Sequence, residues 1–569
     1  MRSSPSGASI AATRRAIPPT PNRSATTSPA PTRSPVLALH FTAKGTGSWQ
    51  CADGKLVRGD DSIVPLDHPM LTVDAFSSGV DHIALAILEH PAAALDERSL
   101  YLQHGDEDLV AQARAETENW PLHWLWLEAS GGTIELRSSR WATVPLFLTG
   151  DATGARAHWD PVALYRWIRP RLDVELAAHY LRTFDLPYGP QTLFADLWRL
   201  AARHDARWTS GTGWRVRPYG AHPPDYPRVL RADVDPAAGF GALLRQTIDR
   251  ALPPGPAPIA CGLSGGMDSA AVTTMVAALG YEVRSFGIIL PGAAGEAQAA
   301  RRQAIAIDRV AADTPLAAAE MPNWTARLAD PSVPFAPWEE LQYEPFDRLY
   351  REAVAQGCRT FLTGLGGDEL FARYRDEAED GLDAPENAAV EDPAAARLRA
   401  ELFTDLVLVD GAARSEAAAR QLQHFAQPSA MDAVAGVAAQ MLRHGLWPVH
   451  PLVSPELAGY AHALPLEWRA DRRVLAELLA VQGVDERIAR DPSPESFTPL
   501  FDRAFADCGV LEDLIEARAL TAAGFVRPGA ARRLLEARRA GAEDAGDLYL
   551  IAIAALEASL RAITAATTR

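Results

Sequence analysis

The hydrophobic pattern of the first third of the chain predicts short β-strands. Apolar and polar residues alternate over 36–41 (VLALHF), 123–129 (HWLWLEA), 133–139 (TIELRSS) and 144–150 (VPLFLTG), with turn residues between the runs. A period of two is typical of strands that bury one face. The pattern predicts an antiparallel β-rich domain with helices packed on it, and we interpret residues 160–230 as a connector that follows it.

The pattern changes at about residue 236. From there, helical runs alternate with short apolar runs: 237–252 is helical, 259–263 apolar, 283–290 apolar, 351–357 helical and 360–365 apolar. This alternation predicts an α/β fold with a doubly wound parallel sheet, whose ligand site lies at the carboxyl ends of the strands. Residues 400–569 are expected to be mainly helical.

Charge and composition exclude several classes of protein. The net charge of −17 argues against general nucleic-acid binding, and no run of 18 apolar residues predicts a membrane span. The four scattered cysteines (Cys51, Cys261, Cys358 and Cys508) indicate neither a zinc site nor a disulfide framework, and they fit a reducing cytoplasm. Residues 1–35 are rich in Ser, Thr, Pro and Ala and predict a disordered arm.

The stretch 261–274 (CGLSGGMDSAAVTT) predicts a phosphate-binding turn between a strand and a helix. Glycines let the main chain approach an anion, and the amides at the helix start point towards it. The hydroxyls of Ser264 and Ser269 are further donors, whereas Asp268 is expected to hold a metal ion that bridges to phosphate. The alternative is a glycine-rich turn that only packs a helix on a strand. The Gly-Lys-Ser/Thr ending of the P-loop is missing.

A second glycine-rich motif lies at 361–371 (FLTGLGGDELF). Alone it is as often a plain turn as a site. At another strand end of the same sheet, however, its Asp368 is placed to share with Asp268 the Mg²⁺ of bound ATP.

Together the two motifs resemble the synthetase domain of the asparagine synthetase-like family, which also contains β-lactam synthetases, lasso peptide cyclases and peptide amidotransferases. Residues 447–466 resemble a further segment of that domain, and 138–168 more loosely resemble the family's glutaminase domain. The resemblance covers about 36–510. It implies an Ntn-hydrolase-like α+β sandwich of the inactive glutaminase type over 36–230, then an ATP-pyrophosphatase synthetase domain with a helical carboxyl-terminal region over 231–569.

The resemblance also implies roles for individual residues. The main chain of one group would cradle adenine and ribose: Leu263, Gly287, Ile288 and Ile289. A second group would bind pyrophosphate: Ser264, Gly265, Gly266, Asp268 and Ser269. Gly364 would lie beside the ribose and the α-phosphate, and Asp368 would be the second Mg²⁺ ligand.

Three positions depart from the family pattern. Arg2 stands where active glutaminase domains have a cysteine, so glutamine-derived ammonia is not expected. Leu365 replaces a glutamate or tyrosine, so either a general base lies elsewhere or the substrate delivers its amine already neutral. The family's late catalytic lysine is absent, since no lysine follows Lys55, and we expect Arg490 or Arg487 to replace it.

These observations predict an enzyme that adenylates a carboxylate and joins it to an amine, using ATP and Mg²⁺. With no glutaminase, the amine is expected to belong to the substrate, which favours a macrolactam-forming cyclase of the lasso peptide type. Its expected partners are a precursor core peptide, a leader-peptide-binding protein and a leader peptidase. The alternatives are a β-lactam synthetase-like ligase, an ammonia-using peptide amidotransferase, and a non-catalytic nucleotide-binding scaffold.

Two segments are further candidates. Trp338, Tyr343 and Glu344 are predicted to line the substrate cavity. The acidic segment 374–393 is expected to be a solvated loop, with a lid over the active site or a dock for a basic peptide as the alternatives.

Overall fold

A computed structural model of the chain describes residues 38–42, 45–65, 68–91, 100–220, 228–322, 324–329, 335–371, 393–408, 428–490, 497–506, 509–541 and 546–568. The span Pro35–Arg569 forms one compact unit. The predicted arm at 1–35 and residues 374–392 of the acidic segment lie outside the described residues.

Two seven-stranded sheets form the amino-terminal half of the described chain. The first has the order β12-β10-β11-β1-β4-β3-β2, with β1 (Ala38–Thr42), β2 (Gln50–Ala52), β3 (Lys55–Arg58), β4 (Asp61–Val64), β10 (Leu146–Gly150), β11 (Gly154–His158) and β12 (Trp198–Leu200). The second has the order β14-β13-β9-β8-β6-β5-β7, with β5 (Leu71–Ser77), β6 (Ile83–Glu89), β7 (Leu102–His104), β8 (Trp124–Ser130), β9 (Thr133–Ser138), β13 (His204–Thr209) and β14 (Gly213–Pro218). Apart from the parallel pair β5 and β7, the described neighbours are antiparallel.

Alternation along each strand builds the sandwich. In β8, Leu125 and Leu127 belong to the core that also holds the inward residues of the first sheet, whereas Trp124 and Trp126 join the cluster under α1 (Glu107–Glu118). Successive side chains of a strand point to opposite faces, so one strand serves both layers. The four predicted strands are present as β1, β8, β9 and β10.

The segment interpreted as a connector is largely part of the sandwich. After η2 (Pro161–Trp167) and α2 (Val174–Thr183), strand β12 pairs with β10, and the hairpin β13–β14 pairs with β9. Its tryptophans explain the difference, because Trp208 and Trp214 are buried in the sandwich core.

A five-stranded parallel sheet follows, with the order β17-β16-β15-β18-β19. Its strands are β15 (Ile259–Gly262), β16 (Val283–Ile289), β17 (Ala312–Ala317), β18 (Thr360–Leu362) and β19 (Trp447–Val449). The chain first adds strands on one side of β15 and then returns to add β18 and β19 on the other side. The strand order therefore reverses between β15 and β18, and such a switch point is where doubly wound sheets bind ligands.

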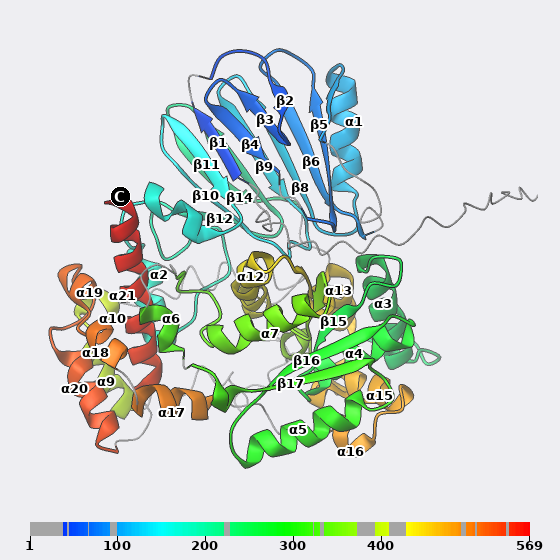
Figure 1. The fold of residues 1–569 in the computed structure, drawn as a ribbon, viewed down its shortest axis with the longest axis vertical. Helices are drawn as coiled ribbons and strands as arrows, with labels where there is room; N and C mark the ends of the chain where they lie inside the picture. Colours follow the sequence, from blue (N-terminus) through cyan, green and yellow to red (C-terminus); the bar gives the residue numbers. More distant parts are fainter. Residues whose placement is uncertain are drawn as a thin grey trace, which may run out of the picture. The chain divides into compact units, whose positions relative to one another are not determined.

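Helices cover both faces of this sheet (Figure 1). Ile259 and Cys261 of β15 pack with α3 (Pro236–Ala251), α4 (Met267–Ala278) and α5 (Ala293–Ala306), whereas Ala260 packs with α7 (Tyr343–Ala355) on the opposite face. Helix α12 (Pro428–Arg443) also contributes to this second cluster. The predicted α/β class is confirmed, with its sandwich, doubly wound parallel sheet and helical carboxyl-terminal region.

The remaining described elements are helical: η3 (Ala318–Glu320), α6 (Thr325–Ala329), α8 (Gly367–Leu370), α9 (Pro393–Leu402), α10 (Asp405–Leu408), η6 (Pro451–Val453), α13 (Pro455–Ala463), α14 (Leu466–Arg469), η7 (Ala470–Arg472), α15 (Arg473–Val481), α16 (Glu486–Ala489), α17 (Thr498–Ala506), α18 (Gly509–Ile515), α19 (Arg518–Ala522), α20 (Ala530–Arg539) and α21 (Asp547–Thr567).

Helix α21 is apolar and long enough to cross a membrane by length and composition alone. Of its most apolar window, however, 72% is buried within the protein. Its leucines and isoleucines pack against α18, α19 and α20, which is the environment of a core helix.

Candidate functional site

The loop between β15 and α4 is held in shape by its own hydroxyls. Ser269 Oγ receives a hydrogen bond from the Ser264 amide at 3.1 Å and donates to the Gly266 carbonyl at 3.0 Å. The hydroxyls of Ser264 and Ser269 lie 3.0 Å apart. Gly265 adopts φ +103°, and a Cβ there would lie 3.0 Å from the Gln298 carbonyl oxygen. Only glycine suits this turn, because that backbone region disfavours side chains.

The first amides of helix α4 have no side-chain cap. Its N-cap is Gly266, which offers no side-chain cap to the first amides of this 12-residue helix. Such amides keep a partial positive charge and seek a ligand acceptor. The structure therefore agrees with the predicted geometry of a phosphate-binding turn, and the binding role itself stays a prediction.

The loop after β18 lies directly against the first loop. A Cβ on Gly364 would be 2.5 Å from the Ser269 amide nitrogen, and one on Gly367 would overlap the Asp268 side chain. Thr363 Oγ1 accepts a hydrogen bond from the Leu365 amide at 3.3 Å. The two motifs, a hundred residues apart in the sequence, thus meet at the switch point of the sheet.

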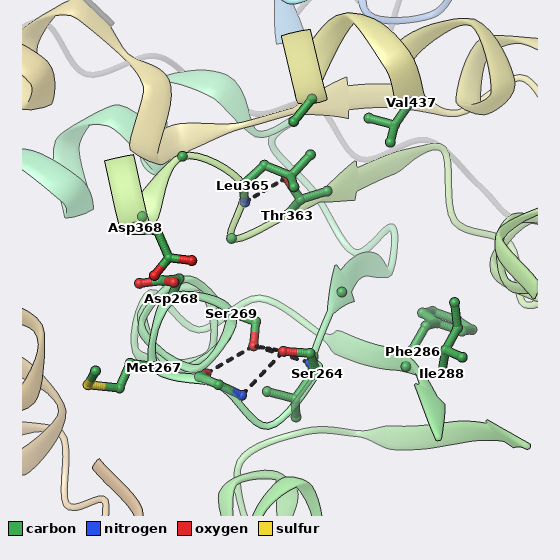
Figure 2. A pocket seen from close by; sticks show the side chains of 18 of the residues that line it. Ser264, Met267, Asp268, Ser269, Phe286, Ile288, Thr363, Leu365, Asp368 and Val437 are labelled. Atoms are coloured by element: carbon green, nitrogen blue, oxygen red, sulfur yellow. Dashed lines mark hydrogen bonds between the residues drawn. The ribbon is translucent and has the colours of Figure 1, made fainter. Parts of the chain in front are cut away.

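The two loops border one cavity of about 540 Å³ (Figure 2). This volume lies within the range of small-molecule sites. Most of the predicted ATP-binding residues line it: Leu263, Ser264, Gly266, Asp268, Ser269, Gly287, Ile288, Gly364 and Asp368. Two others, Gly265 and Ile289, belong to the same loop and strand but do not line the cavity.

Gly287 leaves no room for a side chain of its own. A Cβ there would overlap the guanidinium of Arg302, which is buried, pairs with Asp313 and donates to the Leu263 carbonyl. Arg302 thereby ties β15 to β17 beneath the cavity floor.

Asp268 and Asp368 face one another across the cavity edge (Figure 2). Arg472 bridges them, since its Nη1 lies 2.9 Å from Asp268 Oδ2 and 2.5 Å from Asp368 Oδ1. The Asp268 side chain is 16% exposed and that of Asp368 74%. Burial raises the pKa of Asp268 to about 7; Arg472 opposes this shift and Asp368 adds to it.

These carboxylates fit a magnesium ion. Asp268 Oδ1 is buried and has no hydrogen-bond partner among the described residues, and one cation, the Arg472 guanidinium, is already shared by both acids. The described residues contain no group of three or more metal-binding side chains. Mg²⁺ commonly uses one or two carboxylates together with substrate phosphates and water, so two acids are sufficient.

Arg490 is not brought to this site. It ends the short helix α16, its side chain is 51% exposed, and it pairs with Glu486 at 3.0 Å. Arg487 is 92% exposed and pairs with Asp485. Ile488 and Ala489 of the same segment pack on the core instead, and α16 contacts α15. The expected replacement of the lysine by Arg490 therefore finds no support in the structure.

The arginines among the described lining residues are instead Arg301 and Arg472. Sequence reasoning missed Arg472 because it precedes α15 in a turn with no motif of its own. Asp471 and Arg472 both adopt φ +51°, which is rare for residues other than glycine. The turn is defined by two consecutive residues in the left-handed region, and no local sequence pattern predicts that conformation.

A second cavity of about 420 Å³ adjoins the first. Four residues line both cavities: Leu365, Ala433, Val437 and Phe497. Trp338 lines the second cavity, whereas Tyr343 and Glu344 line neither of the two. The Tyr343 ring lies under Arg327 at 3.6 Å instead. The substrate role predicted for these three residues stays a prediction.

Cys51 does not resemble a catalytic nucleophile. It lies exposed in the edge strand β2, and its thiol contacts the Leu100 carbonyl at 3.1 Å. Position 2 lies outside the described residues, so the expected loss of the glutaminase stays a prediction.

The fold is a doubly wound α/β fold whose cavity lies at the switch point of the sheet, where such folds bind ligands. A family model described as Asparagine synthase matches residues 239–561, which is more than half of the chain. The chain therefore belongs to the asparagine synthase family, whose members are ATP-dependent carbon–nitrogen ligases. A comparison with curated proteins gives no match.

Proposed function

We propose that this protein adenylates a carboxylate of a ribosomal peptide and closes a macrolactam ring by joining it to the peptide's own amine. The observation that carries the proposal is the meeting of Asp268, Asp368 and the open start of α4 at one cavity. This arrangement suits a triphosphate whose α-phosphorus is attacked by an acid.

The residues of the cavity support each part of the step. The amides at the start of α4 and the hydroxyls of Ser264 and Ser269 would bind the departing pyrophosphate. Asp268 and Asp368 would hold Mg²⁺, which neutralises phosphate charge when bound. We propose that Arg472 replaces the missing lysine, because a guanidinium stabilises charge on phosphate and lies beside both acids.

The second cavity supports a peptide rather than ammonia as the source of the amine. Its volume of about 420 Å³ and its aromatic lining residues Trp338, Phe497 and Phe501 suit a peptide segment. An acyl-adenylate is strongly activated, so the protein needs mainly to position the amine and exclude water. Leu365 at the junction supplies no proton acceptor, but it helps to keep the reacting carbonyl dry.

A direct test uses the purified chain, ATP, Mg²⁺ and a pool of synthetic leader-free peptides, each with a free amino terminus and one internal Asp or Glu. The expected result is a peptide lighter by one water, with one AMP and one pyrophosphate per ring. Formation of ADP would exclude adenylation. Asp268→Asn should abolish ATP–pyrophosphate exchange. A non-catalytic scaffold would show no exchange in the wild-type chain, and exchange that survives in Asp268→Asn would contradict the role assigned to Asp268.

Labelled ammonia distinguishes the main alternative. Its incorporation into a linear peptide amide, without ring formation, would identify an ammonia-using amidotransferase. A β-lactam synthetase-like ligase would instead act on a small amino acid derivative. In the proposed setting the cyclase works in the cytoplasm, with a leader-peptide-binding protein and a leader peptidase as partners.

A further inference from the structure

The second cavity combines elements that are distant in the sequence. One wall is the end of α2 with the residues that follow it, a second is the loop 337–342, and a third is one face of α12. Asp432, Ala433, Gly436 and Val437 lie on that face at the spacing of successive helical turns. The cavity is therefore preformed by three elements and opens into the nucleotide cavity beside Leu365.

A buried amide in this cavity lacks a partner. Gln342 is 3% exposed, and its side-chain nitrogen has no hydrogen-bond partner within the described part of the chain. Buried donors are normally satisfied, and leaving one unpaired costs about 1–3 kcal/mol. A ligand carbonyl in the second cavity would satisfy it.

A carboxylate lies in the same cavity. Asp432 Oδ1 accepts a hydrogen bond from Arg199 Nη1 at 2.9 Å, and the Asp432 side chain is 19% exposed. Arg199 is itself fixed by the Gly189 carbonyl and by the Tyr188 ring. Asp432 is thus held rigidly in the lining of the cavity.

We propose that the second cavity binds the acceptor amine of the substrate, with Asp432 pairing with the ammonium group and Gln342 donating to a neighbouring peptide carbonyl. This inference rests on the proposed function and supplies the base that Leu365 cannot be. The cavity lining also contains Glu339, Glu340 and Asp185. Glu339 is neutralised by Arg327 and Arg443, Glu340 Oε1 accepts from the main-chain amide of Gln342 at 2.8 Å, and Asp185 Oδ2 lies 3.6 Å from His179 Nε2.

Each proton and electron pair of the ring-closing step is accounted for. Asp432 accepts one proton from the ammonium group, and the neutral amine attacks the acyl carbon of the adenylate. The new C–N bond forms as the C–O bond to the phosphate breaks, and its electron pair leaves with AMP. The second amine proton leaves with the AMP phosphate, and Asp432 returns its own proton to water.

The environment of Asp432 suits this proton transfer. Burial raises its pKa to about 7, Arg199 opposes that shift, and Asp185 adds to it. Tyr188 is a further titratable group nearby, and Asp432 contributes to the raised pKa of its hydroxyl after burial. A peptide amino terminus has a pKa of about 8, so proton transfer between the two groups is nearly balanced, as an effective base requires.

The test separates adenylation from ring closure. An N-acetylated peptide of the pool that the enzyme cyclises reports adenylation alone, through ATP–pyrophosphate exchange. Asp432→Asn keeps the shape and still accepts from Arg199. We expect exchange within twofold of the wild type but ring closure at pH 7 slower by about 100-fold or more. Raising the pH from 7 to 8 should recover about fivefold, because the neutral fraction of an amine with a pKa of about 8 rises from about 9% to about 50%.

The matched control is Asp160→Asn. Like Asp432, Asp160 pairs with an arginine, in this case Arg443, at 2.7 Å, and its side chain is 16% exposed. Unlike Asp432, it lies outside the cavity. It should leave ring closure and its pH profile unchanged. Gln342→Leu should raise KM for the peptide by about tenfold with kcat preserved.

Three outcomes would overturn the inference. The first is an Asp432→Asn variant that cyclises at the wild-type rate, and the second is one that loses exchange and closure equally, as a structural role predicts. The third is a Glu340→Gln variant that alone shows the pH-recoverable defect. Absence of exchange in the wild type with every peptide would instead contradict the proposed function.

Discussion

Replacing Gly364 by alanine tests the close approach of the two loops on which nucleotide binding depends. The added Cβ would lie 2.5 Å from the Ser269 amide nitrogen, 2.7 Å from the Asp268 carbonyl carbon and 2.8 Å from the Ser269 Cα. All three are main-chain atoms, so no side-chain rotation relieves the overlap. An ordinary contact begins at 3.4 Å, so the loops must part by about 1 Å, which typically costs about 1–3 kcal/mol.

The cost should appear mainly in ATP binding. The free protein relaxes by separating the loops, whereas a ligand that contacts both loops must restore their approach. A loss of 1–3 kcal/mol corresponds to about 5- to 150-fold in dissociation constant. Isothermal titration calorimetry with MgATP measures this directly and needs no peptide substrate.

Gly459→Ala is the matched control. Gly459 lies within α13, and a Cβ there would meet no atom within 4 Å. Alanine should stabilise this helix by about 1 kcal/mol and leave MgATP affinity unchanged. If Gly364→Ala bound MgATP within twofold of the wild type, the two loops would not hold one ligand between them, and the reasoning would be refuted.

Further changes probe the charges of the site. Arg472→Met should lower ATP–pyrophosphate exchange by about 100-fold, with partial recovery in Arg472→Lys and no effect in Arg490→Met; equal losses at both positions would contradict the assignment. The pKa of Asp268 is raised by burial to about 7, and Mg²⁺ binds only the ionised form. MgATP affinity should therefore fall with each pH unit below about 7, by up to tenfold, and calorimetry should find no such slope in Asp268→Asn. Burial favours protonation of Glu339, but Arg327 and Arg443 outweigh it and lower its pKa to about 2. The stabilising contribution of the Glu339 carboxylate is present above its ordinary pKa and is lost as the pH falls towards 2. Glu339→Gln should lower the free energy of unfolding, measured by urea denaturation, by about 3–5 kcal/mol. A loss below about 1 kcal/mol would show that the two arginines are stable without this carboxylate.

Local patterns predicted the parts of the site that lie on consecutive residues. The loop 264–269 is set by its own glycines and hydroxyls, and the apolar runs around it form β15 and α4 as expected. The same holds for the loop after β18. Each of these features depends on neighbours in the chain, so the sequence alone places Asp268 and Asp368 at strand ends of one sheet.

The expected role of Arg490 finds no support in the structure, for the opposite reason. That expectation relied on the order of residues late in the chain, whereas the position of an arginine in space is decided by how α15 and α16 pack. That packing leaves Arg490 in solvent and brings Arg472, 204 residues from Asp268, to both carboxylates. The connector over 160–230 was misjudged likewise, since its strands complete sheets whose other strands lie earlier in the chain.

The amino-acid sequence by itself determined the fold class, the two glycine-rich loops after β15 and β18, and the acids in those loops. Periodicity, glycine conformations and helix starts are properties of short stretches of sequence. Only the tertiary structure decided that those loops touch, that Arg472 bridges their acids, and that Asp432 meets Arg199 across 233 residues beside a second cavity. These pairings arise from the burial of whole helix faces against the sheet, and burial sums over residues that no local pattern connects.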